Sequence, residues 1–326
     1  MKAWTQDRYG DASKLTLATV PVPVPADDEV LVDVAATSIN AADRYFSDPA
    51  LLMRPMLGGL RGPKSLIGGL DVAGTVVAVG SGVDRFEVGD RVFGDVGGGF
   101  GAFTAARHDR LALLPEAVSF EQAGGVPVAG LTALQGFRDI AGVESGQRVL
   151  VNGASGGVGT FAVQVAVALG AEVVAACSTP KVDEAKALGA TEGVDYTAVD
   201  VIDHFVGRSE RFDVLFDVAG VHSVKARAQL LTDDGCCVFV GAPSGGSIFG
   251  PLLGFAGMMI AGKLSSGDFR SFTAKSDGDD MAVLAEMMGR GQVRTVVEDV
   301  IPFAEMPDAM RRFAAGHLAG KLVVAG

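Results

Sequence analysis

The chain has few of the residues from which metal sites, disulfide frameworks and nucleic-acid surfaces are built. It contains three cysteines, two of them adjacent, and four histidines scattered over 326 residues. This spacing predicts neither a disulfide framework nor a zinc site. Basic residues are scarce as well, 27 against 39 acidic ones, for a formal net charge of -12. Because duplex DNA and anionic membranes attract the opposite sign of charge, we expect no nucleic-acid partner.

A long hydrophobic run is also missing. The longest apolar stretch, residues 252–262, is short and broken by glycine, and the first eleven residues lack the apolar core of a signal peptide. The few cysteines fit a reducing compartment. We expect a cytoplasmic protein with no membrane partner.

Glycine, by contrast, is abundant, at 45 residues, and hydrophobic residues make up 48% of the chain against 20% charged residues. This balance is typical of a well-packed globular enzyme. The glycines follow no G-X-Y period, so they indicate close packing or a close approach of the backbone to a ligand. A chain of this length usually divides into two domains.

The pattern of the sequence changes near residue 121. Before it, β-branched runs and turn residues predict strands, as at 30–35 and 72–79. After it, short aliphatic runs alternate with helical patterns, which is typical of βαβ units on a parallel sheet. These runs lie at 148–152, 172–177, 212–218 and 236–240. We therefore expect an α/β protein with a doubly wound parallel sheet of the Rossmann type and a second, β-rich domain.

The last part of the chain predicts a helix at 279–289 and a strand at 292–297. Another helix and a closing strand at 322–325 follow. We expect the closing strand to return to the N-terminal domain.

The strongest local signal follows the run at 148–152, where glycine-rich residues lead into a helix with apolar side chains on one face. Glycines let the backbone approach phosphate groups, and a helix N-terminus offers unpaired N–H groups with a favourable dipole. This pattern predicts a dinucleotide-binding loop, and the alternative is a tight turn without a ligand. The loop residues expected to bind the cofactor are Ala154, Ser155, Gly156, Gly157, Val158 and Gly159.

The end of the next strand indicates which dinucleotide is bound. An acidic residue usually binds the free ribose 2′-hydroxyl of NAD there, but this chain has no carboxylate between Cys177 and Lys181. The hydroxyl of Ser178 and the ammonium of Lys181 suit the 2′-phosphate of NADP instead. Alternatively, Ser178 caps the next helix and Lys181 is solvated. We expect NADPH as the cofactor.

Several further segments follow one another in a characteristic order over nearly the whole chain. They are 37–43, 69–74, 88–92, 129–133, the glycine-rich loop, 194–196 and 320–324. Together they resemble the medium-chain dehydrogenase/reductase superfamily, specifically its zinc-independent, zeta-crystallin-like quinone oxidoreductase branch. Such a series of matches is more specific than any one motif.

The resemblance implies a division into domains. A GroES-like β-rich catalytic domain would cover 1–121 and be completed by 266–326. A Rossmann NADP-binding domain would cover 122–265, with the strand at about 292–297 as a candidate last strand of its sheet. Relatives commonly join their Rossmann sheets edge to edge, so this aliphatic strand predicts a homodimer.

The resemblance also implies that zinc is absent. Zinc-dependent members have a cysteine ligand near the position of Asn40 and Gly-His-Glu where this chain has Gly69, Leu70 and Asp71. They often carry a four-cysteine lobe as well, whereas residues 93–106 contain no cysteine. Alcohol oxidation relies on a Lewis acid to stabilise the alkoxide. Reduction of a quinone or an activated alkene needs less help, because conjugation spreads the incoming negative charge.

Five more site residues are carried over from the resemblance. Asn40 and Thr132 match positions at the nicotinamide end of the cleft, Tyr196 matches a tyrosine beside the phosphate and ribose, and the backbone of Gly241 matches a turn on the nicotinamide side. Tyr45 lies where some quinone reductases place a tyrosine whose phenol would donate a proton to a carbonyl oxygen. Asn40 and Tyr45 are the expected catalytic residues. Alternatively, Asn40 caps a turn, Thr132 caps the following helix, Tyr196 ends a strand and Tyr45 packs on the surface.

We therefore expect an NADPH-dependent reductase of quinones or α,β-unsaturated carbonyl compounds that works by hydride transfer. One alternative is a non-catalytic NADPH-binding sensor or structural protein, because no unmistakable acid–base residue stands out. Another is an enoyl-thioester reductase, but the net charge gives no sign of the basic patch that an acyl carrier would need.

Overall fold

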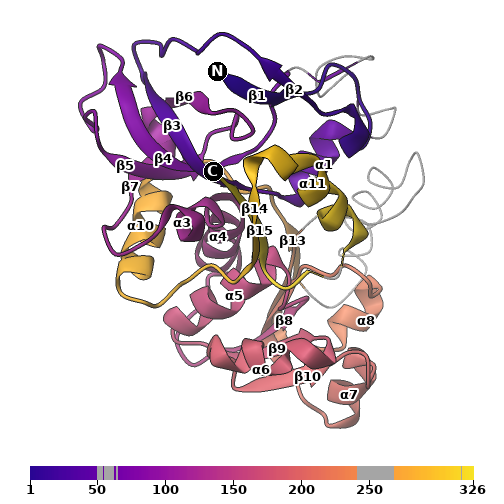
Figure 1. Cartoon of the computed structure of the whole chain (residues 1–326). Coiled ribbons are helices and arrows are strands. Elements are labelled where there is room, and N and C mark those ends of the chain that lie inside the picture. The colour runs from indigo at the N-terminus through magenta and orange to yellow at the C-terminus, as the bar shows by residue number, and fades with distance from the viewer. Residues whose placement is uncertain (50–53, 55–61, 64, 241–267, 317) are drawn as a thin grey trace. The chain divides into compact units, whose positions relative to one another are not determined.

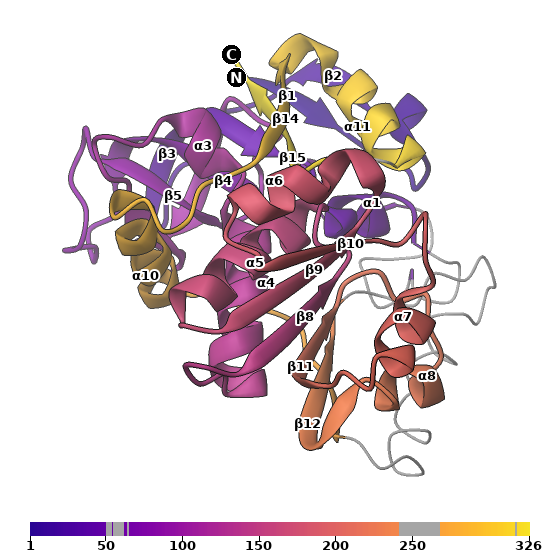
Figure 2. The ribbon, with the colours of Figure 1, turned by 90° about the horizontal axis from the view of Figure 1, so that it is seen from below.

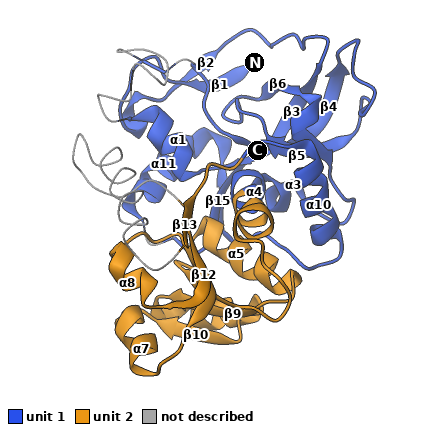
Figure 3. Cartoon of the chain, turned by 180° about the vertical axis from the view of Figure 1, so that it is seen from behind, with its two compact units in different colours: residues 1–131, 275–326 blue, residues 132–274 orange. Residues whose placement is uncertain are grey.

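Figure 1 shows the computed structural model of the chain, which describes residues 1–49, 54, 62–63, 65–240, 268–316 and 318–326. The chain forms two compact units (Figure 3): unit 1 comprises Met1–Leu131 and Lys275–Gly326, and unit 2 comprises Thr132–Ala274. Both boundaries lie later in the chain than 121 and 266, where the sequence suggested them. The first lies later because α3 (Phe120–Gly124) packs on the sheet of unit 1.

Unit 1 is built on a seven-stranded sheet in the order β14, β15, β3, β4, β5, β7, with β6 also paired to β3. Valines at alternate positions, such as Val30 and Val32, point to its core because side chains alternate across a strand. The strands are β3 (Glu29–Ser38), β4 (Asp71–Val79), β5 (Arg91–Asp95), β6 (Phe103–Arg107), β7 (Leu111–Leu113), β14 (Val297–Pro302) and β15 (Lys321–Ala325). Since β15 pairs antiparallel with β3, the closing strand returns to the N-terminal part of the chain, as predicted.

The rest of unit 1 surrounds this sheet. A separate antiparallel pair joins β1 (Lys2–Thr5) and β2 (Thr16–Thr19). The other described helices of unit 1 are α1 (Ala41–Ser47), α10 (Gly278–Gly289) and α11 (Met306–Ala315), together with the first residues of α4 (Pro127–Gln135). Its described residues also form the short 3-10 turns η1 (Ala12–Lys14), η2 (His108–Arg110) and η5 (Phe303–Glu305).

The valine-rich segment 292–297 is not a Rossmann strand, so that prediction is wrong. Residues 292–296 form no strand, and Val297 begins β14, which pairs with β15 in the sheet of unit 1. Val293 and Val296 are buried in unit 1. The aliphatic pattern therefore reflects burial, and the edge-to-edge argument for a dimer no longer has its strand.

Unit 2 contains a six-stranded, all-parallel sheet in the order β10, β9, β8, β11, β12, β13. Numbered along the chain, this is the 3-2-1-4-5-6 order of a doubly wound Rossmann fold. Figure 2 shows β9, β8, β11 and β12 side by side. The strands are β8 (Arg148–Asn152), β9 (Glu172–Cys177), β10 (Glu192–Asp195), β11 (Phe212–Asp217), β12 (Leu231–Phe239) and β13 (Asp268–Ser271). The expected fold class is confirmed.

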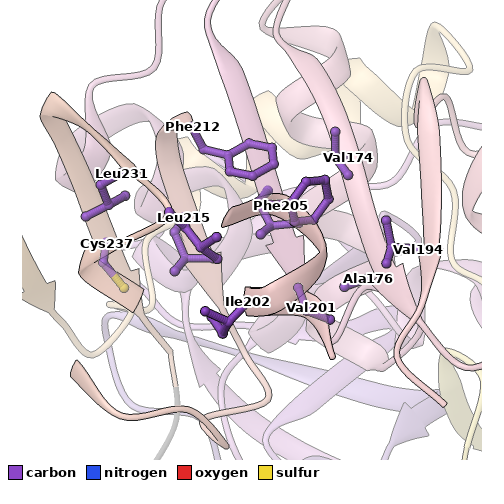
Figure 4. Packing of buried hydrophobic residues seen from close by; sticks show 12 residues of the cluster. Val174, Ala176, Val194, Val201, Ile202, Phe205, Phe212, Leu215, Leu231 and Cys237 are labelled. Carbon is purple, nitrogen blue, oxygen red and sulfur yellow. The ribbon is translucent and has the colours of Figure 1, made fainter. Parts of the chain in front are cut away.

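The sheet of unit 2 carries an aromatic and aliphatic core on the face that α7 covers (Figure 4). Phe205 of α7 and Phe212 of β11 meet edge to face, with ring centroids 4.9 Å apart. The described helices that lie wholly in unit 2 are α5 (Gly157–Ala168), α6 (Val182–Ala187), α7 (Val201–Gly207) and α8 (Val224–Ala228), with the π-helical turn η3 (Gly136–Ala141) and the 3-10 turn η4 (Thr179–Lys181). Among the described residues, none of the helices is long and apolar enough to cross a membrane.

Candidate functional site

The glycine-rich loop lies at the point where the strand order of unit 2 reverses. The chain moves from β8 outward to β9 and β10, then crosses back to β11 on the other side of β8. At such a switch point the loops at the carboxyl ends of the two central strands diverge and leave a crevice for a ligand. The loop follows β8 directly, so the topology places it at this edge of the sheet.

Two glycines of this loop are required by space or by backbone conformation. Gly153 has φ +87°, in the left-handed region that favours glycine. A Cβ on Gly159 would lie 2.1 Å from the carbonyl oxygen of Gly153, so α5 packs directly on the loop backbone. A Cβ on Gly156 would meet nothing closer than 3.7 Å. Gly156 therefore leaves open space beside the loop, where the backbone can approach a ligand.

The first turn of α5 is open to an anion. Gly156 is the N-cap and has no side chain to accept a hydrogen bond from the first helical N–H groups. The N–H of Ala154 donates to the carbonyl of Ala176, which holds the start of the loop against β9. The residues Ser155, Gly156, Gly157 and Val158 are partly exposed. The structure thus brings the six predicted loop residues together around a helix N-terminus suited to phosphate.

The second part of the expected cofactor site lies where β9 and β10 end. Ser178 is the N-cap of η4, but its hydroxyl makes no capping hydrogen bond, so the capping alternative is not observed. Lys181 ends the same turn. Tyr196 follows β10, is 52% exposed, and donates its backbone N–H to the carbonyl of Cys177. Tyr196 therefore lies beside the end of β9 and is about half exposed.

A carboxylate also lies at this place, on the neighbouring strand. Asp195 pairs in register with Cys177. It accepts hydrogen bonds from the hydroxyl groups of Thr179 and Thr197 and from the Thr197 backbone. Its hydrogen bond from Thr179, followed by that from Thr197, lowers the pKa of Asp195 below the usual value. Its oxygens are therefore already engaged by local donors.

In unit 1, Asn40 belongs to a buried polar cluster. The Nζ of Lys321 donates to Oδ1 of Asn40 over 2.5 Å and lies 3.2 Å from Oδ2 of Asp71. Nδ2 of Asn40 donates to the same Asp71 oxygen over 2.9 Å. Both ends of the Asn40 amide are thus engaged within the protein, which fixes the orientation of its side chain.

Two carboxylates of this cluster accept further hydrogen bonds. Asp71 accepts from the Ser38 hydroxyl at 2.5 Å and from the backbone N–H of Val128 at 2.8 Å. Asp43 caps the start of α1 by accepting from the N–H of Asn40, and it also accepts from the N–H of Leu70. Burial raises the pKa of Asp43 to about 7, even though its hydrogen bond from the Asn40 backbone acts in the opposite direction.

These residues do not fit a catalytic zinc. Asn40, Leu70 and Asp71 stand where the zinc-dependent pattern has cysteine, histidine and glutamate. The amide of Asn40 is engaged, Leu70 has no donor atom, and the Asp71 carboxylate is paired with the Lys321 ammonium. In the part of the chain that the structure describes, no group of three or more His, Cys, Asp or Glu side chains could hold a metal ion.

The remaining predicted residues are distributed as follows. Thr132 is buried within α4, so it does not cap a following helix. Tyr45 is half-buried on α1, and its ring meets that of Phe46 edge to face at 6.1 Å. Gly241 lies outside the described residues.

Several polar residues of these regions could not be recognised from the sequence. Asp71 and Lys321 both lie in segments that carry the family resemblance, but their pairing spans 250 positions. In unit 2, a second buried ion pair joins Asp217, at the end of β11, to Arg227 of α8. The only local signal was an acidic residue at the carboxyl end of an aliphatic run.

Comparison with known proteins agrees with this architecture. Residues 26–116 match the alcohol dehydrogenase GroES-like domain, and residues 188–324 match the zinc-binding dehydrogenase family. The chain is 30% identical over 336 residues to the chloroplast envelope quinone oxidoreductase homolog of Arabidopsis thaliana, covering 99% of this chain and 98% of that protein. It is 30% identical over 339 residues to the NADPH-dependent alkenal/one oxidoreductase of the same plant, covering 99% and 79%.

A solved structure has the same fold over the whole chain. The quinone oxidoreductase from Coxiella burnetii superposes with a TM-score of 0.85 at 26% identity, covering 100% of this chain and 99% of that one. Members of this group bind a nicotinamide cofactor, for which the loop after β8 provides the expected site. The chain is therefore an oxidoreductase that belongs to the medium-chain dehydrogenase/reductase superfamily, in its quinone oxidoreductase branch.

Proposed function

We propose that this chain reduces quinones or α,β-unsaturated carbonyl compounds with NADPH and without zinc. The observation that carries the proposal is the loop after β8, where Gly159 packs on the Gly153 carbonyl and the first turn of α5 has no side-chain cap. Two relatives named for quinone and for alkenal/one chemistry support the substrate class.

The residues of unit 2 fit a dinucleotide phosphate. The open backbone at Gly156 and the N-terminus of α5 would hold the pyrophosphate. Ser178 and Lys181 would address a 2′-phosphate, and the Tyr196 ring would pack beside it. Asp195, the nearby carboxylate, lies at the end of β10 rather than β9 and already accepts hydrogen bonds from Thr179 and Thr197. NADPH, when bound, supplies the hydride.

In unit 1, Asn40 and Tyr45 are the residues proposed to act on the substrate. The Asn40 amide is held by Lys321 and Asp71 and retains one N–H of its Nδ2 for another acceptor. The Tyr45 phenol would donate a proton to the carbonyl oxygen that becomes negative on hydride addition. Thr132 and the Gly241 backbone would border the nicotinamide end.

An NADPH and substrate screen tests the function. We expect oxidation of NADPH, followed by its absorbance, with several quinones and enones and little with simple aldehydes. Tyr45→Phe should lower kcat for enones more than it changes NADPH binding, because only the proton donor is lost. Tight NADPH binding without turnover on the whole panel would favour the non-catalytic sensor, and turnover only with enoyl thioesters would favour the enoyl-thioester reductase.

Zinc independence has its own test. The purified protein should contain no stoichiometric zinc and keep its activity in a chelator, because Lys321 already neutralises the Asp71 carboxylate. One tightly bound zinc per chain in elemental analysis would contradict the proposal.

We also propose a cytoplasmic homodimer. The three cysteines are buried free thiols, which is compatible with a reducing compartment. Relatives in this branch commonly form dimers by joining their Rossmann sheets edge to edge, and the described outer strands of the unit 2 sheet are β10 and β13. Sedimentation at micromolar concentration should give a dimer, and a monomer alone would contradict this part of the proposal.

A further inference from the structure

We propose that Arg227 is a positioning residue for the nicotinamide cofactor. Through the buried Asp217 it holds the turn Val218–Gly220 against the start of the glycine loop. This inference rests on the proposed function, because it concerns how unit 2 keeps its cofactor loop in shape.

Asp217 is the centre of a row of residues at the carboxyl edge of the sheet. In register, Asn152 of β8 pairs with Asp217 of β11, and Asp217 pairs with Phe239 of β12. Asn152 is the residue before Gly153, so the glycine-rich loop begins directly after this row of residues. A displacement of Asp217 should therefore also displace Gly153, the first residue of the loop.

The hydrogen bonds of Asp217 tie the two central loops together. Its Oδ1 accepts from Nδ2 of Asn152 at 2.9 Å and from the backbone N–H of Gly220 at 3.0 Å. In return, the backbone carbonyl of Asn152 accepts from the N–H of Val218 at 2.9 Å. One carboxylate oxygen thus orients the last residue of β8 and closes the turn after β11.

That turn lies against the glycine loop. A Cβ placed on Gly153 would come within 3.2 Å of the backbone nitrogen of Ala219. Gly220 has φ +67°, and a Cβ there would lie 3.1 Å from the Phe239 ring. The turn is therefore confined between Gly153 on one side and Phe239 on the other.

Arg227 supplies the charge that this arrangement requires. The Asp217 side chain is fully buried, and a buried carboxylate is costly unless a cation compensates it. Nε of Arg227 lies 2.6 Å from Oδ2 of Asp217, although neither atom has a hydrogen-bond partner with good geometry among the described residues. The attraction is therefore electrostatic. It engages Oδ2, while Oδ1 accepts the hydrogen bonds from Asn152 and Gly220.

The Arg227 guanidinium is itself held in place. It lies over the Phe239 ring, 5.1 Å from the centroid, and the side chain is only 5% exposed. Phe239 therefore contacts both the arginine and Gly220. Removal of the guanidinium leaves Asp217 without its counter-charge and loosens the ring that supports the turn.

Strand β8, which ends at Asn152, provides a matched control at its amino end. Arg148 begins β8, pairs with Glu210, and lies over the Phe212 ring at 4.8 Å. Arg148→Met and Arg227→Met thus remove the same kinds of contact from the amino and carboxyl edges of one sheet. Only the second edge carries the cofactor loop.

The test is a fluorescence titration of NADPH and NADH into the full chain and its variants, with thermal unfolding in parallel. Arg227→Met should raise the Kd for both dinucleotides by about tenfold, because the loop that both share is displaced. Arg227→Lys, which restores a positive charge, should recover part of the affinity. Arg148→Met should lower the unfolding temperature and leave both Kd values unchanged.

The outcomes separate the two proposals. Wild-type protein that binds neither dinucleotide overturns the proposed function and the positioning role with it. If the wild-type protein binds and Arg227→Met binds equally well, only the positioning role is overturned. The same holds if Arg148→Met loses as much dinucleotide affinity as Arg227→Met. If Arg227→Met does not fold, the neutral pair Asp217→Asn/Arg227→Met replaces it. That variant should bind both dinucleotides weakly, and wild-type affinity would overturn the role.

Discussion

Nζ of Lys321 lies 3.2 Å from Oδ2 of Asp71, and the two side chains are 3% and 0% exposed. The pair joins β15, near the C-terminus, to β4 of the N-terminal part, with β3 between the two strands. Its members are also bonded to Asn40, which follows β3. Strand β15 is therefore attached by the buried Lys321–Asp71 ion pair as well as by its backbone pairing with β3. The same ion pair orients the side chain of Asn40, a proposed site residue.

Lys321→Met should strongly destabilise the protein. The change leaves the Asp71 carboxylate buried without its cation, and loss of one partner of such a pair costs about 3–5 kcal/mol. Urea unfolding at pH 7 measures it. Arg312→Met is the control, because its pair with Asp299 is about half exposed and screened by solvent, so its loss should destabilise the protein far less. Equal losses in the two variants would show that the buried pair has no special weight.

The stability of the protein should fall as the pH rises from 5 to 8. Burial raises the pKa of Asp43 to about 7 and that of Asp95 to about 6, from an ordinary value of 3.8. The folded state therefore holds these protons where the unfolded state has lost them. The stabilisation is complete below about pH 4 and is lost as the pH rises through the folded values.

Calorimetry across this range checks the sign. Asp43→Asn and Asp95→Asn should each flatten the dependence of the unfolding temperature on pH. Asp299→Asn should not, because the hydrogen bond from Arg312 lowers the pKa of Asp299 and moves its effect to more acidic solution. An unfolding temperature that rises between pH 5 and 8 would contradict the prediction.

Two glycine substitutions should separate packing of the loop from space for a ligand. Gly159→Ala places a Cβ 2.1 Å from the Gly153 carbonyl, so it should lower the unfolding temperature and NADPH affinity together. Gly156→Ala meets nothing closer than 3.7 Å and has φ -79°, which alanine adopts readily. It should fold normally and still bind NADPH more weakly, because the backbone approaches the phosphates there. Unchanged affinity in Gly156→Ala would place the phosphates elsewhere.

Lys181→Ala tests the choice of cofactor. Loss of a charge-assisted contact to the 2′-phosphate should weaken NADPH binding by about 1.5–3 kcal/mol, roughly tenfold to a hundredfold in Kd. NADH lacks this phosphate, so its Kd should hardly change. The double variant with Ser178→Ala should lose more NADPH affinity, though not additively, because both groups address one phosphate.

Lys186→Ala on α6 is the charge-matched control for this titration, since Lys186 is exposed on the next helix. It should leave both affinities unchanged at fixed salt. Equal weakening of NADPH and NADH in Lys181→Ala would indicate a general defect of the loop.

The sequence by itself determined the first strands of unit 2 and the position of the glycine-rich loop. The aliphatic runs that begin at Arg148 and Glu172 are strands with the expected limits. Such runs are legible because burial on both faces of a parallel strand demands continuous apolar residues. The requirement for glycine at 159 was equally local, since it arises between residues six positions apart.

Only the tertiary structure decided which charges meet and where the apolar segment before Val297 packs. Val293 and Val296 have the pattern of a strand, but they are buried in unit 1 without forming one, because periodicity reports burial and does not identify the partner. Lys321 and Asp71, and likewise Arg227 and Asp217, are unremarkable charged residues until the fold removes them from water. Their roles come from burial. Away from water, the attraction between two paired charges is far stronger than in solvent, and an unpaired charge is strongly destabilising.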